Sequence, residues 1–160
     1  MHPILIADLC RDNIQPGCIS AIVMVKWPYS SARHEMALIL AEPSLRLRRA
    51  NGQVKVRFTG AGALTLAMAD VAVGDEVRLS LQGAVAKSES EPKQLRGGIA
   101  FELCYTEIMA VWVLRNGDPI FRLNTDIDTD VAPDLQQPSR SSRTRKMVGC
   151  QSRSCATCSF

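Results

Sequence analysis

The chain has 160 residues, of which 46% are hydrophobic, and its formal net charge is +3. A chain of this size encloses one hydrophobic core with tails rather than two cores. No stretch approaches the roughly 20 apolar residues that a membrane span needs, and the amino terminus lacks the features of a signal peptide. We therefore expect a soluble intracellular protein with no membrane partner.

The positive charge is concentrated near the carboxyl terminus. All 16 acidic residues lie at or before Asp134, whereas five of the 19 basic residues follow it. Net charge therefore gives no support for nucleic-acid binding by the folded part, since a binding groove needs a locally positive surface. Cys150, Cys155 and Cys158 offer three of the four ligands of a structural zinc, with no histidine nearby, so we expect no metal.

Three strands are predicted in the first part of the chain. Cys18–Trp27 is almost continuously apolar and β-branched, which indicates a long buried strand. Met36–Ala41 is a second apolar run. Gly52–Phe58 alternates apolar with basic residues, so one face of this third strand is expected to contact water. Turn residues between the second and third strands predict a tight return.

The apolar period then changes. Leu64, Ala67, Met68 and Val71 recur at spacings of three and four, which predicts a short helix that buries these residues. The segment from Glu76 onward alternates again and predicts a fourth strand.

The last part of the folded region holds a predicted loop and a predicted strand. Residues 82–98 lack an apolar period and are predicted to form a long loop. A fifth strand is predicted around Ile108–Leu114, with residues 118–123 as a possible hairpin partner.

This order of elements is that of an OB-fold, a five-stranded Greek-key β-barrel, in an all-β protein with one short helix. Another kind of small β-barrel is the alternative. We assign residues 1–16 to an N-terminal arm, residues 17–124 to the OB domain, and residues 125–160 to a tail whose acidic and then Ser/Arg-rich composition predicts disorder.

The segment after the first strand would lie at the mouth of the ligand groove of an OB-fold. Trp27 and Tyr29 offer flat faces on which bases can stack, and Pro28 restricts the backbone between them. Arg48, in a cluster of three arginines, is either a phosphate contact or part of a solvated turn. The other basic residues expected to contact phosphates are Lys26, Arg33, Lys55 and Arg57.

Two aromatic residues have an alternative assignment to the core. Trp27 has the same strand parity as Ala21 and Val23, so it could close the core instead of stacking on bases. Phe58 has the parity of the inward-facing valines of its strand, and the pattern therefore favours the core. Tyr29 is expected to be exposed.

No catalytic constellation is present in the sequence. The only histidines are His2 and His34, and there is no G-x-S-x-G, Walker or H-E-x-x-H motif. Glu102 and Glu107 could form a carboxylate pair, but nothing in the sequence orients them, and surface charge is the ordinary explanation. We therefore expect neither an enzyme nor a cofactor nor a small-molecule substrate.

The segment VKWPYSSARHEMALIL, followed by VKVRFTG, a short helix and VGDEVRLSL, resembles the N-terminal OB domain of the protection-of-telomeres family, most closely its fungal members. The resemblance covers about residues 4–127. It rests on Lys-x-Pro-Tyr-x-Ser after strand 1, Phe-x-Gly after strand 3 and Gly-Asp before strand 4. It implies binding of the single-stranded, G-rich 3′ overhang in the nucleus, at telomeres, with telomere-capping proteins as possible partners.

The resemblance also implies site residues. Lys26 would contact DNA, and Phe58 would stack on a base, which is opposite to the assignment from strand parity. Met24 and Lys87 stand where some members have stacking aromatics. The candidate DNA-binding residues are Lys26, Trp27, Tyr29, Ser31, Arg33, Arg48, Lys55, Arg57, Phe58 and Lys87.

Departures from the family leave other functions open. Family members usually have a second OB domain and a C-terminal region that recruits a partner protein. The tail SRSSRTRKMVGCQSRSCATCSF resembles neither, as expected of a truncated product or a single-domain paralogue. With fewer stacking aromatics, the barrel could dock proteins in a telomere complex without DNA affinity of its own. Oligosaccharide binding shares the fold but would favour a less basic groove.

Overall fold

A computed structural model describes residues 2–88 and 97–125. The chain divides into two compact units, Met1–Thr129 and Asp130–Phe160, and the second lies outside the described residues. The described elements are η1 (Ile6–Asp8), β1 (Cys18–Ser30), β2 (Glu35–Ala41), α1 (Leu45–Arg48), β3 (Gln53–Thr59), α2 (Gly60–Met68), β4 (Glu76–Ser80), β5 (Val85–Ser88), β6 (Gly98–Tyr105), β7 (Ala110–Arg115) and β8 (Asp118–Asn124). The predicted all-β class is confirmed, and α2 is the helix predicted after the third strand.

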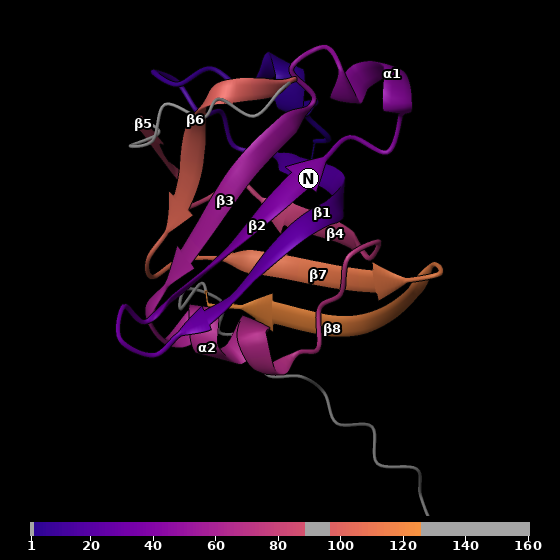
Figure 1. The fold of residues 1–160 in the computed structure, drawn as a ribbon. Coiled ribbons are helices and arrows are strands. Elements are labelled where there is room, and N and C mark those ends of the chain that lie inside the picture. Colours follow the sequence, from indigo (N-terminus) through magenta and orange to yellow (C-terminus); the bar gives the residue numbers. More distant parts are fainter. Residues whose placement is uncertain (1, 89–96, 126–160) are drawn as a thin grey trace, which may run out of the picture. The chain divides into compact units, whose positions relative to one another are not determined.

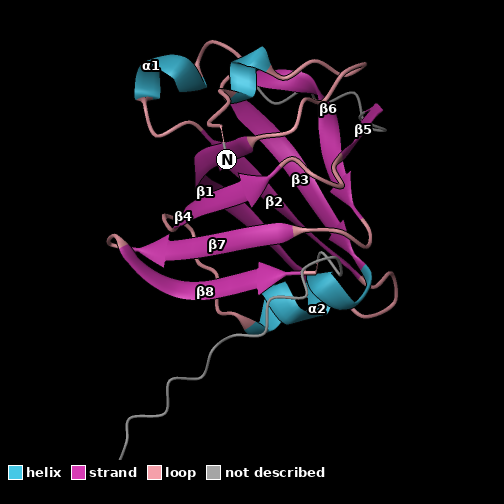
Figure 2. Ribbon diagram, turned by 180° about the vertical axis from the view of Figure 1, so that it is seen from behind, coloured by secondary structure: helices cyan, strands magenta, loops and turns pink. Residues whose placement is uncertain are grey.

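The strands form one sheet in the order β5-β6-β3-β2-β1-β4-β7-β8, in which β3 and β6 are parallel and the other neighbours are antiparallel (Figures 1 and 2). The five predicted strands are β1, β2, β3, β4 and β7, and the possible hairpin partner is β8. The predicted number of strands is wrong, since the described residues contain eight strands. Part of the predicted loop 82–98 forms β5, and the predicted tight return before β3 contains α1.

Strand β6 escaped prediction because it is covered on both faces. Its residues from Phe101 to Tyr105 are all buried, so the strand has no alternation of apolar and polar residues. One face contributes Leu103 and Tyr105 to the core, and the other carries Glu102, which pairs with basic side chains of β3. Because a charged residue lies on one of the two buried faces, the hydrophobicity pattern does not identify this segment as a strand.

Helix α2 and the residues after it bury only part of the predicted apolar set, since Ala67 and Val71 pack on the core and the two large predicted residues of the helix do not. Ala63 and Leu66 are fully buried, whereas Leu64 and Met68 are 46% and 75% exposed. The helix approaches Met109 so closely at Gly62 that a Cβ atom there would lie 2.4 Å from the Met109 side chain. The small residues permit this close approach, so the large side chains of Leu64 and Met68 are not the ones that the helix buries.

The N-terminal arm is part of the packed structure. Ile6 is fully buried in the core, and its backbone N–H donates a hydrogen bond of 2.6 Å to the buried carboxylate of Glu42. Pro3 forms a β-bridge with Cys18, the first residue of β1. Of the segment predicted to be disordered, residues 126–160 lie outside the described residues. Within the described part of the chain, no helix has the length and apolar character to cross a membrane.

A buried hydrogen bond joins the ends of β6 and β4. The Tyr105 hydroxyl donates to the Ser80 carbonyl oxygen at 2.8 Å, and the Tyr105 ring stacks on Phe58 with 5.5 Å between centroids. Burial raises the pKa of Tyr105, so the hydroxyl stays protonated and able to donate. Ser80 is the last residue of β4, and β5 begins shortly after it. The bond therefore lies where the chain passes from one side of the sheet to the other.

We expect Tyr105→Phe to lower the free energy of unfolding by about 1–2 kcal/mol, because it leaves the buried Ser80 carbonyl without its donor. Urea unfolding followed by circular dichroism measures the change. Tyr29→Phe is the matched control, since it removes the same atom at an exposed hydrogen bond to His34 and should change stability less. Equal stability of Tyr105→Phe and the unmodified protein would contradict this role.

Candidate nucleic-acid interface

One extra residue in β1 decides which side chains face the candidate site. Val23 pairs with Leu40 of β2, but Val25 pairs with the next residue, Ile39, so Met24 is inserted as a β-bulge. A shift of one residue exchanges the two faces of a strand. Val25 and Trp27 consequently lie on the outer face, where they are 39% and 41% exposed. The alternative assignment of Trp27 to the core is therefore wrong.

The strand registers bring several predicted residues together on this outer face. Trp27 pairs with Ala37 of β2, which pairs in turn with Arg57 of β3. In the adjacent row, Lys55 of β3 pairs with Glu102 of β6, and Glu102 pairs with Lys87 of β5. One aromatic ring and three basic residues, predicted from separate segments, thus share one surface.

A groove crosses β1, β2 and β3 on this surface. Its volume is about 570 Å³. The Lys55 ammonium lies 5.8 Å from the centroid of the Trp27 ring, within the range of a cation–π interaction. The residues that line the groove are Trp27, Pro28, Ser30, Arg33, Glu35, Met36, Ala37, Lys55 and Arg57. The groove thus combines an aromatic wall with a basic side, as the sequence predicted for this region.

Two carboxylates that were not predicted as site residues offset this basic charge. Arg57 donates to Glu35 at 3.1 Å and to Glu102 at 3.2 Å, and Lys55 lies 3.5 Å from Glu102. Burial acts against the charged form of Arg57, but the hydrogen bonds and charges of Glu102 and Glu35 outweigh it and raise the pKa of Arg57. Glu102 is only 4% exposed, so its assignment to the surface is wrong.

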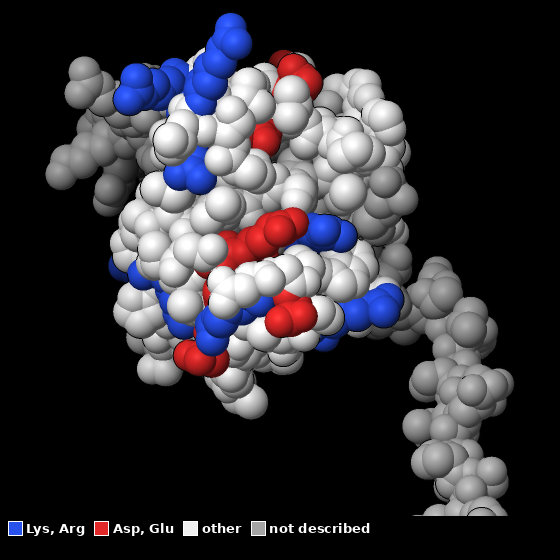
Figure 3. Space-filling view, turned by 90° about the vertical axis from the view of Figure 1, so that its right-hand side faces the viewer, with Lys and Arg blue, Asp and Glu red and all other residues white. Residues whose placement is uncertain are grey.

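The charges are mixed beyond the groove as well. Lys and Arg side chains are interspersed with Asp and Glu on the face shown in Figure 3. Arg33 at the rim is 75% exposed and lies 3.5 Å from Glu35. A ligand of the groove therefore meets alternating donors and acceptors rather than a uniformly positive surface.

Phe58 does not reach the groove. It is fully buried and stacks on Tyr105, so the stacking role that the family resemblance implied is wrong and the core assignment from strand parity is confirmed. Strand β3 pairs with β2 in one continuous register, with Met36 opposite Phe58 and Leu40 opposite Val54. Without a bulge, Phe58 remains on the inner face together with Val54.

Lys26 and Arg48 use their donors within the protein. The bulge turns Lys26 to the inner side, where its ammonium donates to the Val71 carbonyl oxygen at 2.8 Å. Arg48 donates to the carbonyl oxygens of Glu42 at 2.6 Å and Pro43 at 3.3 Å, which attaches α1 to the end of β2. The structure therefore gives both residues structural contacts rather than an orientation into the groove.

The end of β1 and the turn after it contain the remaining candidates, because β1 extends past the predicted end at Trp27 to Ser30. Tyr29 was expected to be exposed, but it is half-buried against the core, with its hydroxyl 3.1 Å from Nδ1 of His34. Ser31 and Arg33 are exposed in the following turn. This turn borders the groove, and Arg33 is the member of this group that lines it.

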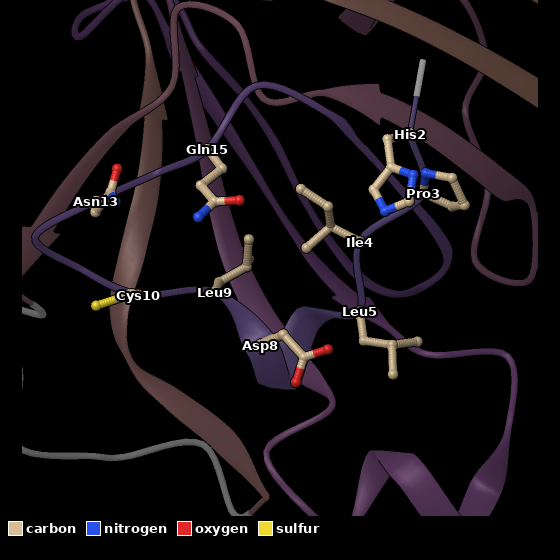
Figure 4. Close-up of a pocket in the computed structure, with 9 residues that line it drawn as sticks. All are labelled: His2, Pro3, Ile4, Leu5, Asp8, Leu9, Cys10, Asn13 and Gln15. Carbon is tan, nitrogen blue, oxygen red and sulfur yellow. The ribbon is translucent and has the colours of Figure 1, made fainter.

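A separate hollow lies beside the N-terminal arm (Figure 4). It has a volume of about 390 Å³ and is lined by residues between His2 and Gln15, which include Asp8 and Cys10. None of the candidate DNA-binding residues lines it. Among the residues that the structure describes, no three His, Cys, Asp or Glu side chains gather as a metal site.

A family model described as Domain of unknown function (DUF8502) matches residues 1–120. The chain belongs to this family. The match includes the arm, all of β1 to β7 and every candidate residue of the groove. A comparison with curated proteins finds no match.

Sequence reasoning missed Glu35, which lines the groove, and it missed Val25 and Glu102, which lie on the same face of the sheet outside the groove lining. The bulge that exposes Val25 left no mark on the continuously apolar segment around it. The alternation in β3 puts Lys55 and Arg57 on the outer face. Glu102 could have been assigned to the same face only if the parallel pairing of β3 with β6 had been known.

A partly buried ion pair between Asp75 and Arg115 stabilises the loop whose Val71 carbonyl oxygen accepts the hydrogen bond from Lys26. Asp75 accepts hydrogen bonds from the Ala72 N–H at 2.7 Å and from Nε and Nη2 of Arg115 at 2.9 and 3.0 Å. The hydrogen bond with Arg115 is the largest effect that lowers the pKa of Asp75, while burial opposes it. Because the pKa is lower in the folded state, the ionised carboxylate stabilises the fold.

We expect Asp75→Asn to reduce the free energy of unfolding by about 1–3 kcal/mol at neutral pH. The stabilisation is fully present above the unfolded pKa of about 3.9 and is lost as the pH falls through the lower folded value. Urea titrations from pH 7 down to pH 2 should therefore show the difference from the unmodified protein shrinking below about pH 4. Asp70→Asn, at a 94% exposed carboxylate 3.9 Å from Arg115, is the control. A difference that does not depend on pH would contradict this assignment.

Proposed function

We propose that this domain is a noncatalytic module that binds single-stranded nucleic acid in the groove across β1, β2 and β3. The resemblance to the protection-of-telomeres family favours G-rich telomeric DNA as the ligand and chromosome-end protection in the nucleus as the role. The observation that carries the proposal is the exposed Trp27 ring, placed by the bulge beside Lys55 and Arg57 at a groove.

The strand pairing supports an OB-type barrel with a divided fourth strand. β1, β2 and β3 form an antiparallel meander, β3 pairs in parallel with β6, and β1 pairs with β4. β4 and β5 are separated by residues 81–84, and β5 pairs with β6. Together they link the two sides of the sheet as a single fourth strand would. In this arrangement the groove over β2 and β3 lies where OB-folds bind oligonucleotides.

The chemistry of the groove suits an unpaired base. The Trp27 ring offers a stacking face, and Lys55, Arg57 and Lys87 provide positive charge for phosphates. Glu35 lines the groove and carries a carboxylate that accepts hydrogen bonds from base amino groups, such as the N2 amine of guanine. This acceptor would favour guanine, and the pairing of Glu35 and Glu102 with basic side chains would weaken attachment that depends on charge alone.

We expect Trp27→Ala to weaken binding of a G-rich telomeric oligonucleotide by about 1–3 kcal/mol, or roughly 5- to 150-fold, because the stacking surface is lost. Trp27→Phe, which keeps a flat ring, should retain most of the affinity. Met68→Ala removes another exposed apolar side chain, on α2, and is the control. Fluorescence anisotropy of a labelled oligonucleotide measures all three. Unchanged affinity in Trp27→Ala would eliminate the groove as the binding site.

We expect Glu102→Gln to raise affinity for oligo-dT at low salt, because it removes the carboxylate that neutralises Lys55 and Arg57. If one further phosphate contact forms, the slope of log affinity against log salt concentration steepens by about 0.7. Glu107→Gln, which makes the same charge change at an exposed residue outside the groove, is the matched control. Equal effects of the two variants would show that Glu102 does not limit the positive charge that Lys55 and Arg57 offer to the ligand.

A second function, docking of a protein segment, is favoured by the apolar residues around the bulge. Met24, Val25 and Trp27 are 38%, 39% and 41% exposed and are neighbours in the chain. Such residues at the centre of an interface bind apolar side chains of a partner. The oligonucleotide titration of the unmodified protein separates the two functions, because a surface that only docks proteins shows no affinity for oligonucleotide.

A further inference from the structure

A second tryptophan lies on the outer face of the sheet, away from the groove. Trp112 of β7 pairs with Arg78 of β4 on one side and with Arg122 of β8 on the other. Both arginines are exposed, and Trp112 is half-buried between them. Val111 and Val113, which precede and follow Trp112, are fully buried on the opposite face. The row Arg78, Trp112 and Arg122 is called the Trp112 surface below.

The charges of this surface are only partly compensated. The Arg122 guanidinium lies 5.6 Å from the centroid of the Trp112 ring, and within the described part of the chain it forms no ion pair. Arg78 lies 3.3 Å from Glu76 but is 56% exposed. The surface therefore offers a flat indole ring, one guanidinium within cation–π distance of it, and a positive charge available to an anionic ligand.

A cavity of about 200 Å³ adjoins the ring. Trp112, Arg122 and Ile108 line it, together with the amide side chains of Gln82 and Asn124. A peptide carboxylate would use the arginines but not the flat face of the indole ring. The lining thus favours a nucleotide over an acidic peptide.

We propose that the Trp112 surface is a second contact for single-stranded nucleic acid. In this contact a base stacks on the Trp112 ring, and the flanking phosphates contact Arg78 and Arg122. The ligand class rests on the proposed function, but the surface does not include the groove. Arg78 pairs with Ser20 of β1, and Trp27 lies seven residues further along that strand, roughly 20 Å away at the usual rise of a strand.

This separation predicts a dependence on the length of the oligonucleotide. A strand of a few nucleotides occupies one contact at a time, whereas a longer strand can occupy both. Two linked contacts increase the overall affinity without any new interaction at either of them. The gain from a longer strand should therefore disappear when the Trp112 surface is altered.

The two tryptophans of the chain allow each contact to be observed separately. In Trp27→Phe the emission comes from Trp112, and in Trp112→Phe it comes from Trp27. Each variant is titrated with a 12-nucleotide G-rich oligomer, oligo-dT of the same length and polyglutamate. We expect saturable quenching of Trp112 by the oligonucleotides. In the Trp27→Phe background, Arg122→Gln should weaken this binding by about fivefold or more, and Arg46→Gln, an exposed arginine of α1, should change it less.

The outcomes separate the two contacts. A response of Trp27 with none of Trp112 overturns this inference and leaves the groove function intact. A response of Trp112 with none of Trp27 supports the inference and contradicts the groove. Equal quenching of Trp112 by polyglutamate and by oligonucleotide overturns the inference, because it shows that the surface recognises negative charge alone. The absence of any response contradicts both proposals.

Discussion

The insertion of Met24 in β1 is the constraint on which the candidate site depends. Before the bulge, β1 follows the ordinary alternation and contributes Ile19, Ala21 and Val23 to the core. After it, the inner and outer faces are exchanged. An indole on the inner face would have to be accommodated in a core of nearly fully buried side chains, whereas on the outer face it forms one wall of a groove. The same exchange turns Lys26 to the inner side of the sheet, where its ammonium donates a hydrogen bond to the Val71 carbonyl oxygen.

Ion pairs across β2, β3 and β6 determine the electrostatic character of this groove. A guanidinium between two carboxylates is well satisfied, and Glu102 is nearly buried, so none of these charges can be removed without leaving a partner partly desolvated. A ligand must compete with pairs that already exist. Recognition in such a site depends on stacking and on matched hydrogen bonds more than on long-range attraction, which would distinguish it from a nonspecific basic surface.

The connection between the two sides of the sheet depends on a short stretch of backbone and one phenol. β4 completes its pairing with β1 at Ser80, and β5 begins a separate pairing with β6 a few residues later. The interruption leaves the Ser80 carbonyl inside the protein, and the Tyr105 hydroxyl satisfies it. The ring of Tyr105 also covers Phe58, so the residue that closes this gap belongs to the core that supports β3 beneath the groove.

Local patterns in the sequence determined the all-β class, the first four strands, the helix after the third and the hairpin of β7 and β8. They also determined which segments supply Trp27, Lys55 and Arg57, whereas Lys87 came from the family resemblance. Tertiary structure alone decided the side on which Trp27 projects, the pairing of Glu102 with basic residues, and the burial of Phe58 against Tyr105. The reason is that alternation records the faces of a strand only while its register is unbroken, and the sequence does not display a bulge or the parallel partner of β3. Such features arise from contacts between segments that lie far apart in the chain.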